Sequence, residues 1–296
     1  MSESILLRTA AWHGDELIRL ALPDAWQTTV FWPRTPPPLT DAALAQALEQ
    51  PVGQAPIREL ARGKIHPVLI VDDLTRPTPV DRVLPLLLDH LEQAGIKSEK
   101  VTIVIASGGH APPALPDLAR KLGPRASSQC RVIVHDYLHE LTPAGRTSFG
   151  THVLANRHVL ESDLVVGVSG IYPHHTAGFG GGAKLALGVL GKRSILALHY
   201  GHPGADGSYE VDNSFRRDLA EVAQLIGLRT MVSLHVDADR QPVRVSCGDQ
   251  LAYFDDAVAF SHRFFGAPHP AGADIVICNA YPMDGSLTFA NAKGAE

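Results

Sequence analysis

The sequence predicts an α/β fold in which a mainly parallel sheet is flanked by helices. Short apolar runs rich in Val and Ile alternate along the chain with amphipathic stretches of helical spacing. Such runs are typical of parallel strands buried on both faces, and strands that alternate with helices indicate an α/β architecture. We therefore expect strands at residues 66–71, 101–106, 131–135, 164–168, 231–236 and 274–278.

Amphipathic spacing predicts four helices beside these strands. In residues 80–94, leucines recur three and four positions apart, and Gly95 follows where a helix C-terminus favours glycine. Thr40 or Asp41 can cap the first helix at its N-terminus. The four helices are expected at residues 42–48, 80–94, 218–226 and 251–264.

Two stretches rich in proline or glycine interrupt this pattern. Residues 32–39 (WPRTPPPL) suit an extended connector, and residues 266–272 (GAPHPAG) precede the last apolar run. We place a domain boundary at the second stretch, so that residues 1–268 form an N-terminal α/β domain. Residues 269–296 are too few to bury a core of their own, so they either pack onto the first domain or form the beginning of a truncated second α/β domain.

Composition excludes several classes of protein. The 296 residues carry a net charge of −5 and are 45% hydrophobic, which argues against a disordered chain and against general attraction to nucleic acid. We find no apolar run long enough for a membrane span and no secretion signal in MSESILLRTA. Three widely spaced cysteines do not suit a disulfide framework or a zinc site. We expect a cytoplasmic enzyme.

Four polar clusters follow the predicted strands. They are residues 72–79 (DDLTRPTP), 107–112 (SGGHAP), 169–184 (SGIYPHHTAGFGGGAK) and, one short helix later, His199. In open α/β sheets, ligands bind outside the carboxyl ends of the strands. Convergence of the four clusters on one rim of the sheet is the strongest indication of an active site.

The first three clusters contain groups suited to anion binding and proton transfer. Arg76 offers a planar fork for a carboxylate or phosphate, although a helix-capping loop with an Asp–Arg pair is the alternative. An imidazole at His110 or His174 can exchange a proton near neutral pH, whereas a lone surface histidine is usually inert. Because adjacent residues do not share a face, we expect at most one of His174 and His175 to point into the site.

The glycine-rich segment is similar to a phosphate-binding loop but lacks its ending. A P-loop requires Gly-Lys-Ser/Thr, whereas Lys184 lies between Ala183 and Leu185, so ATP binding is disfavoured. Glycines still let backbone N–H groups approach an anion, and we expect the following helix to add its positive end. Lys184 is either a nucleophile desolvated by the apolar run after it or a surface lysine.

His199 is either a core residue or a metal ligand. The sequence offers no H-E-x-x-H motif and no cysteine pair to complete a metal site of protein side chains alone. One histidine could still bind a metal whose other donors belong to a cofactor.

Together, the four clusters resemble the nickel-dependent lactate racemase family, in the family's order and at similar spacing. Residues 273–294 also look like the opening of that family's second domain. The resemblance implies a nickel-pincer nucleotide, a pyridinium mononucleotide with two thio-acyl arms. Lys184 would hold one arm as a thioamide and His199 would ligate the nickel. The remaining cofactor-binding residues would be Asp73, Thr75, Gly180, Gly181 and Gly182.

The resemblance also implies a racemase or epimerase of 2-hydroxy acids that works by reversible hydride transfer. His110 and His174 would act as acid and base, Arg76 would bind the substrate carboxylate, and Lys293 would reach the substrate from the second domain. The expected partners are a small 2-hydroxy acid and cofactor-biosynthesis proteins, with no nucleic acid and no membrane.

The chain departs from the family at Ala290, where a glutamine is common, and family members continue much further. Two alternatives therefore stay open. One is a module that binds the cofactor without catalysis, and the other is a nucleotide-binding phosphotransferase or hydrolase.

Overall fold

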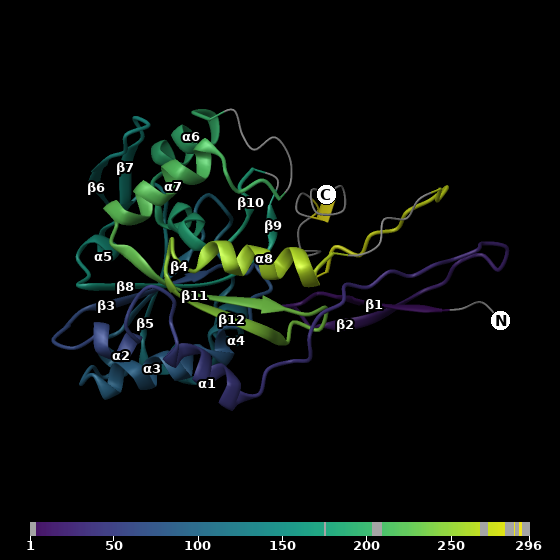
Figure 1. The fold of residues 1–296 in the computed structure, drawn as a ribbon, viewed down its shortest axis with the longest axis horizontal. Coiled ribbons are helices and arrows are strands. Elements are labelled where there is room, and N and C mark those ends of the chain that lie inside the picture. The colour runs from purple at the N-terminus through teal and green to yellow at the C-terminus, as the bar shows by residue number, and fades with distance from the viewer. Residues whose placement is uncertain are drawn as a thin grey trace.

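A mainly parallel sheet forms the middle layer of the protein (Figure 1). The structure, a computed structural model, describes residues 4–174, 176–202, 209–266, 272–281, 287 and 290–291. Within these residues the main sheet has six strands in the order β12-β11-β8-β3-β4-β5. Neighbouring strands are parallel except for β12, which is antiparallel to β11. The strands are β3 (Pro67–Asp72), β4 (Thr102–Ala106), β5 (Arg131–Val134), β8 (Leu164–Gly170), β11 (Leu228–Val236) and β12 (Pro242–Asp249).

Helices cover both faces of this sheet because its strands alternate apolar side chains between two cores. Ile70 and Val104 belong to one core, whereas their neighbours Leu69 and Ile103 belong to the other. The second core is closed by α1 (Asp41–Glu49), α2 (Ile57–Leu60), α3 (Leu84–Gln93) and α4 (Leu115–Gln129). The first is closed by α5 (Arg157–Leu160), α6 (Lys192–Tyr200), α7 (Ser214–Leu225), α8 (Phe254–Phe264) and the 3₁₀ helix η3 (Gly182–Val189).

Three antiparallel pairs and two short 3₁₀ helices complete the fold. The hairpin β1 (Ile5–Thr9) and β2 (Glu16–Leu20) extends from the body, and the segment 272–281 runs alongside it (Figure 1). The hydroxyl of Tyr281 donates to Asp15 Oδ1 at 2.8 Å and so connects the two. The other elements are β6 (Leu141–Arg146) with β7 (His152–Asn156), β9 (Pro173–His174) with β10 (Gly178–Phe179), η1 (Val80–Arg82) and η2 (Ser98–Lys100).

The predicted fold class is confirmed, and five of the six predicted strands coincide with β3, β4, β5, β8 and β11. The prediction of a strand at residues 274–278 was wrong. Among the described residues these form no ladder with a neighbouring strand, and the side chains of Ile275, Val276 and Ile277 are more than half exposed. An apolar run becomes a strand only where a sheet edge is available to pair with it.

The four predicted helices are confirmed, with shifted ends. Thr40 caps α1, since its Oγ1 accepts from the N–H of Ala43 at 3.2 Å. The stretch 80–94 divides into η1 and α3, and Asn213 starts α7 before its predicted beginning. The proposed boundary near residue 268 falls among residues 267–271, outside the described part, so the domain division stays a prediction. No helix in the described residues has the length and apolar character needed to cross a membrane.

We predict that Gly188→Ala destabilises the protein. Gly188 lies against the end of β4, where an added Cβ would meet both Cβ and the carbonyl oxygen of Ala106 at 2.5 Å. Overpacking of this kind costs about 1–3 kcal/mol in the free energy of unfolding, measured by urea denaturation. Gly109→Ala is the control, because its Cβ would meet nothing within 4 Å. Equal stability of the two variants would contradict the close packing of η3 on β4.

Candidate active site

The loops that follow β3, β4 and β8 meet at one rim of the sheet. These three strands are adjacent and parallel, so their carboxyl ends point the same way. Contacts join the three clusters at the rim: Gly170 N donates to Asp72 Oδ2 at 3.1 Å, and His110 Nδ1 lies 2.7 Å from Asp73 Oδ2. Three of the four predicted polar clusters are therefore neighbours.

Asp73 and His110 form the central hydrogen-bonded pair of this rim. Asp73 Oδ2 lies 2.7 Å from His110 Nδ1, while Asp73 Oδ1 accepts from the N–H and the hydroxyl of Thr75 at 3.1 and 2.5 Å. Burial by itself would raise the pKa of Asp73, but the hydrogen bond and charge of His110, with Thr75 and Arg76, outweigh it and lower the pKa. Asp73 is thus an ionised acceptor that orients the more exposed His110 ring.

Asp72, one residue earlier, connects β3 to β8. Thr78 Oγ1 donates to Asp72 Oδ2 at 2.5 Å and lies 3.2 Å from the hydroxyl of Tyr172, which follows β8. On the other side, Lys121 Nζ of α4 forms an ion pair with Asp72 Oδ1 at 2.7 Å. This network fixes the DDLTRPTP loop against both neighbouring elements.

The glycine-rich segment folds back tightly on β8. Gly181 and Gly182 have φ of 80° and 57°, in the left-handed region that favours glycine. A Cβ on Gly181 would lie 2.4 Å from Ile171 Cδ1, so no larger residue fits there. Gly178 of β10 pairs with His174 of β9, which places His174 at the start of the segment.

Arg216, on α7, forms hydrogen bonds to the backbone of this segment. The sequence pattern did not predict this residue. Its guanidinium donates to the carbonyl oxygens of Phe179, Ala177 and Gly181 at 2.6, 3.3 and 3.5 Å, and it lies 3.8 Å from the centre of the Phe254 ring. Burial lowers its pKa to about 10. Asparagine is a residue type that favours a helix N-cap. Starting the predicted helix at Asn213 would have placed Arg216 in its first turn and on its buried face.

The ring hydrogen bonds of three histidines assign their neutral tautomers. His110 Nδ1 faces a carboxylate and His199 Nδ1 donates to the carbonyl oxygen of Ile195 at 2.9 Å, so in both rings Nε2 has the lone pair. The buried His174 is the opposite case: its Nδ1 accepts from Thr176 N at 3.2 Å, so Nε2 bears the hydrogen.

Two further predicted residues, Lys184 and His199, lie on η3 and α6. Lys184 is half-buried in η3, and His199 lies in the last turn of α6, exposed, with its ring 5.6 Å from that of Phe215. The expected α-helix directly after the glycines is instead the 3₁₀ helix η3, and α6 begins only at Lys192. Lys293 and His175 lie outside the described residues. Within the described chain, no group of three His, Cys, Asp or Glu side chains is gathered for a metal ion.

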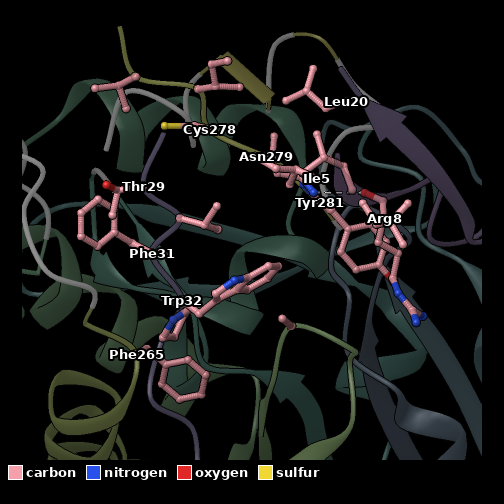
Figure 2. A pocket seen from close by; sticks show the side chains of 18 of the residues that line it. Ile5, Arg8, Leu20, Thr29, Phe31, Trp32, Phe265, Cys278, Asn279 and Tyr281 are labelled. Carbon is pink, nitrogen blue, oxygen red and sulfur yellow. Dashed lines mark hydrogen bonds between the residues drawn. The ribbon is translucent and has the colours of Figure 1, made fainter. Parts of the chain in front are cut away.

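A cavity of about 1390 Å³ lies beside this rim, between the β1–β2 hairpin and the segment 272–281 (Figure 2). Figure 2 shows apolar and aromatic side chains around it, including those of Phe31, Trp32 and Phe265. Among the described residues that line it are Pro77 and Tyr172, but not His110, His174 or Lys184. The cavity therefore adjoins the predicted site without containing its chemistry.

Comparison with known proteins identifies relatives of this chain. Residues 13–207 match the family model described as the lactate racemase N-terminal domain. The lactate racemase of Thermoanaerobacterium thermosaccharolyticum is 31% identical over 257 residues, covering 84% of this chain and 60% of the relative. That of Lactiplantibacillus plantarum is 28% identical over 251 residues, covering 82% and 59%. The chain thus spans about 60% of the length of the curated relatives it matches.

Two solved structures share the fold of this chain. The lactate racemase apoprotein from Thermoanaerobacterium thermosaccharolyticum superposes with a TM-score of 0.74 at 28% identity, covering 88% of this chain and 63% of that one. A crystal structure of a protein from Thermotoga maritima, at 20% identity and a TM-score of 0.62, covers 78% and 60% and shares the fold. The resemblance found in the sequence motifs is confirmed, and the chain belongs to the lactate racemase family.

Proposed function

We propose that this chain is the cofactor-binding part of a racemase or epimerase that acts on 2-hydroxy acids. The observation that supports it most directly is the pair of histidines with opposite tautomers: His110 presents a lone pair on Nε2 and His174 presents a hydrogen. Inversion of a carbon that bears a hydroxyl requires one group to take the hydroxyl proton and another to supply one. Each enantiomer would meet the two groups in the opposite order.

In one direction His110 is the base. Its Nε2 takes the hydroxyl proton, and Asp73, 2.7 Å from Nδ1, stabilises the imidazolium that results. As the acid, His174 would give up its Nε2 proton from the imidazolium form, in which Nδ1 also bears a hydrogen and donates it to Thr176 Oγ1, 3.1 Å away, in place of accepting from the N–H of Thr176. Each ring then has the protonation state required for the reverse reaction, which a racemase must also catalyse.

Arg76 would bind the substrate carboxylate. Its backbone N–H donates to the carbonyl oxygen of Asp73 at 3.1 Å, which keeps it on the same turn as the Asp73–His110 pair. A guanidinium can hold a carboxylate through two parallel hydrogen bonds and so fix the orientation of the neighbouring carbon.

The predicted cofactor-binding residues have the chemical groups that a nickel-pincer nucleotide requires. Gly181 and Gly182 adopt backbone conformations in which a side chain would clash, and their segment provides N–H groups for an anion. Lys184 offers a half-buried amine, and His199 a ring nitrogen with a lone pair for nickel. Asp73, Thr75 and Gly180 would complete the binding site. When bound, such a cofactor supplies an acceptor and donor for the hydride on C2 of the substrate.

The domain division and partners follow from the same proposal. Residues 1–268 would bind the cofactor, residues 269–296 would begin a closing domain that includes Lys293, and cofactor-biosynthesis proteins would deliver the nucleotide. Because the chain spans about 60% of the length of its relatives, a second candidate is a module that binds the cofactor without turnover.

We predict that the nickel- and cofactor-loaded protein interconverts the enantiomers of at least one 2-hydroxy acid. Single enantiomers of lactate, malate and an aryl 2-hydroxy acid are incubated separately in D₂O and separated by chiral chromatography. Hydride transfer predicts inversion with the C2 hydrogen retained, because that hydrogen never exchanges with solvent. Deuterium at C2 would instead indicate proton abstraction, and loaded protein that inverts none of the acids would favour the binding module.

We predict that Lys184→Ala prevents covalent attachment of the cofactor. The amine of Lys184 is the group that would form the thioamide, so the intact-mass adduct should disappear. Lys192→Ala is the matched control, since Lys192 is an exposed lysine at the start of α6. An adduct that persists in Lys184→Ala would remove this residue from its role.

We predict that His110→Ala and His174→Ala retain the cofactor adduct but lose racemisation by about 10²- to 10⁴-fold, the usual contribution of a positioned acid or base. The control is His139→Ala, because the side chain of His139 is 73% exposed and pairs with Asp136, three residues earlier in the chain. Racemisation at control rates in both variants would rule out the two-histidine scheme.

A further inference from the structure

Lys121 is a fully buried lysine that contacts the loop at the end of β3. Its ammonium lies 2.7 Å from Asp72 Oδ1, and it donates to the carbonyl oxygens of Asp73 and Arg76 at 2.7 and 3.0 Å. The side chain is 0% exposed. Two of these three oxygens belong to the backbone of residues that the proposed function uses.

Burial of an ammonium is unfavourable unless oxygens replace the water that it loses. Desolvation lowers the pKa of Lys121, and the charge of Asp72 opposes this. A methionine would fill similar space without that penalty, and a buried ion pair is seldom a net gain in stability over apolar packing. What an apolar side chain cannot do is bind two backbone carbonyls on opposite sides of a turn.

The surroundings of Lys121 keep it directed at the loop. Trp12, in the turn between β1 and β2, lies with its ring 5.1 Å from the ammonium and is itself buried. α4 has a break at Gly123, with φ of 77°, where a Cβ would lie 3.1 Å from Asp81 Cβ. The break lets α4 approach the start of η1 closely and brings Lys121 beneath the loop.

We propose that Lys121 is a positioning residue of the active site, which holds the backbone of residues 73–76 so that Asp73 meets His110 and Arg76 stays on the same turn. Its contact with the chemistry is indirect, since it touches the carbonyl groups of these residues and not their reacting ends. The inference rests on the proposed function for its consequence in catalysis, but its structural part can be measured without substrate or cofactor.

The experiment compares Lys121→Met with the double variant Asp72→Asn/Lys121→Met, by amide hydrogen exchange of the protein without cofactor. The double variant avoids an uncompensated buried carboxylate. We expect the amides of Thr75 and Arg76, which donate to Asp73, to exchange about 10- to 100-fold faster in both variants, as for the loss of hydrogen bonds from a charged donor. The amides of Val71 and Ile105, inside the sheet, should keep their protection.

Lys100→Met, at an exposed lysine, is the control and should change none of these rates. Native protection at Thr75 and Arg76 in the double variant, or a uniform loss of protection through β3 and β4, would overturn the proposal. If the wild type racemises a 2-hydroxy acid, the double variant should lower kcat and raise KM together. A wild type that inverts no substrate refutes the proposed function and leaves the exchange result to decide the role of Lys121.

Discussion

Two adjacent carboxylates, Asp72 and Asp73, stand at the end of the central strand β3, where both residues are almost fully buried. Removing a charge from water costs several kcal/mol unless neighbouring groups compensate it. Each element around the rim therefore contributes a compensating group. β8 supplies the N–H of Gly170, α4 supplies Lys121, and the loop after β4 supplies His110. The geometry of the site depends on satisfying these two charges together.

The two carboxylates have different partners. Asp72, the last residue of β3, contacts Thr78 and Lys121, whereas Asp73, the first residue after the strand, contacts His110. The first connects β3 to its neighbours and the second orients an imidazole. Two adjacent residues thus contact different elements, since Asp72 contacts β8 and α4 whereas Asp73 contacts the loop after β4.

The sequence predicted the sheet and most of the rim because both rest on local patterns. Apolar runs marked β3, β4 and β8, and the polar residues directly after them had to lie at their carboxyl ends. α4 was missed because Gly123-Pro124 indicates a helix end, whereas the chain passes through Gly123 with a positive φ and continues. Because Lys121 lies on α4, its buried position was not predicted either. Arg216 could not be assigned because its partners are backbone carbonyls far away in sequence, which leave no residue pattern.

The N-terminal hairpin connects this rim to the segment where the second domain is proposed to begin. Tyr281 donates to Asp15, Arg240 also pairs with Asp15 at 3.3 Å, and the guanidinium of Arg240 lies 4.6 Å from the centre of the Trp12 ring. Trp12 in turn covers Lys121, which binds the backbone of Asp73 and Arg76. An isolated two-stranded hairpin is marginally stable in water, so its contacts at the turn and along the segment 272–281 hold it in place. A continuous series of contacts therefore runs from the segment 272–281 to the backbone of Asp73, whose carboxylate is paired with His110.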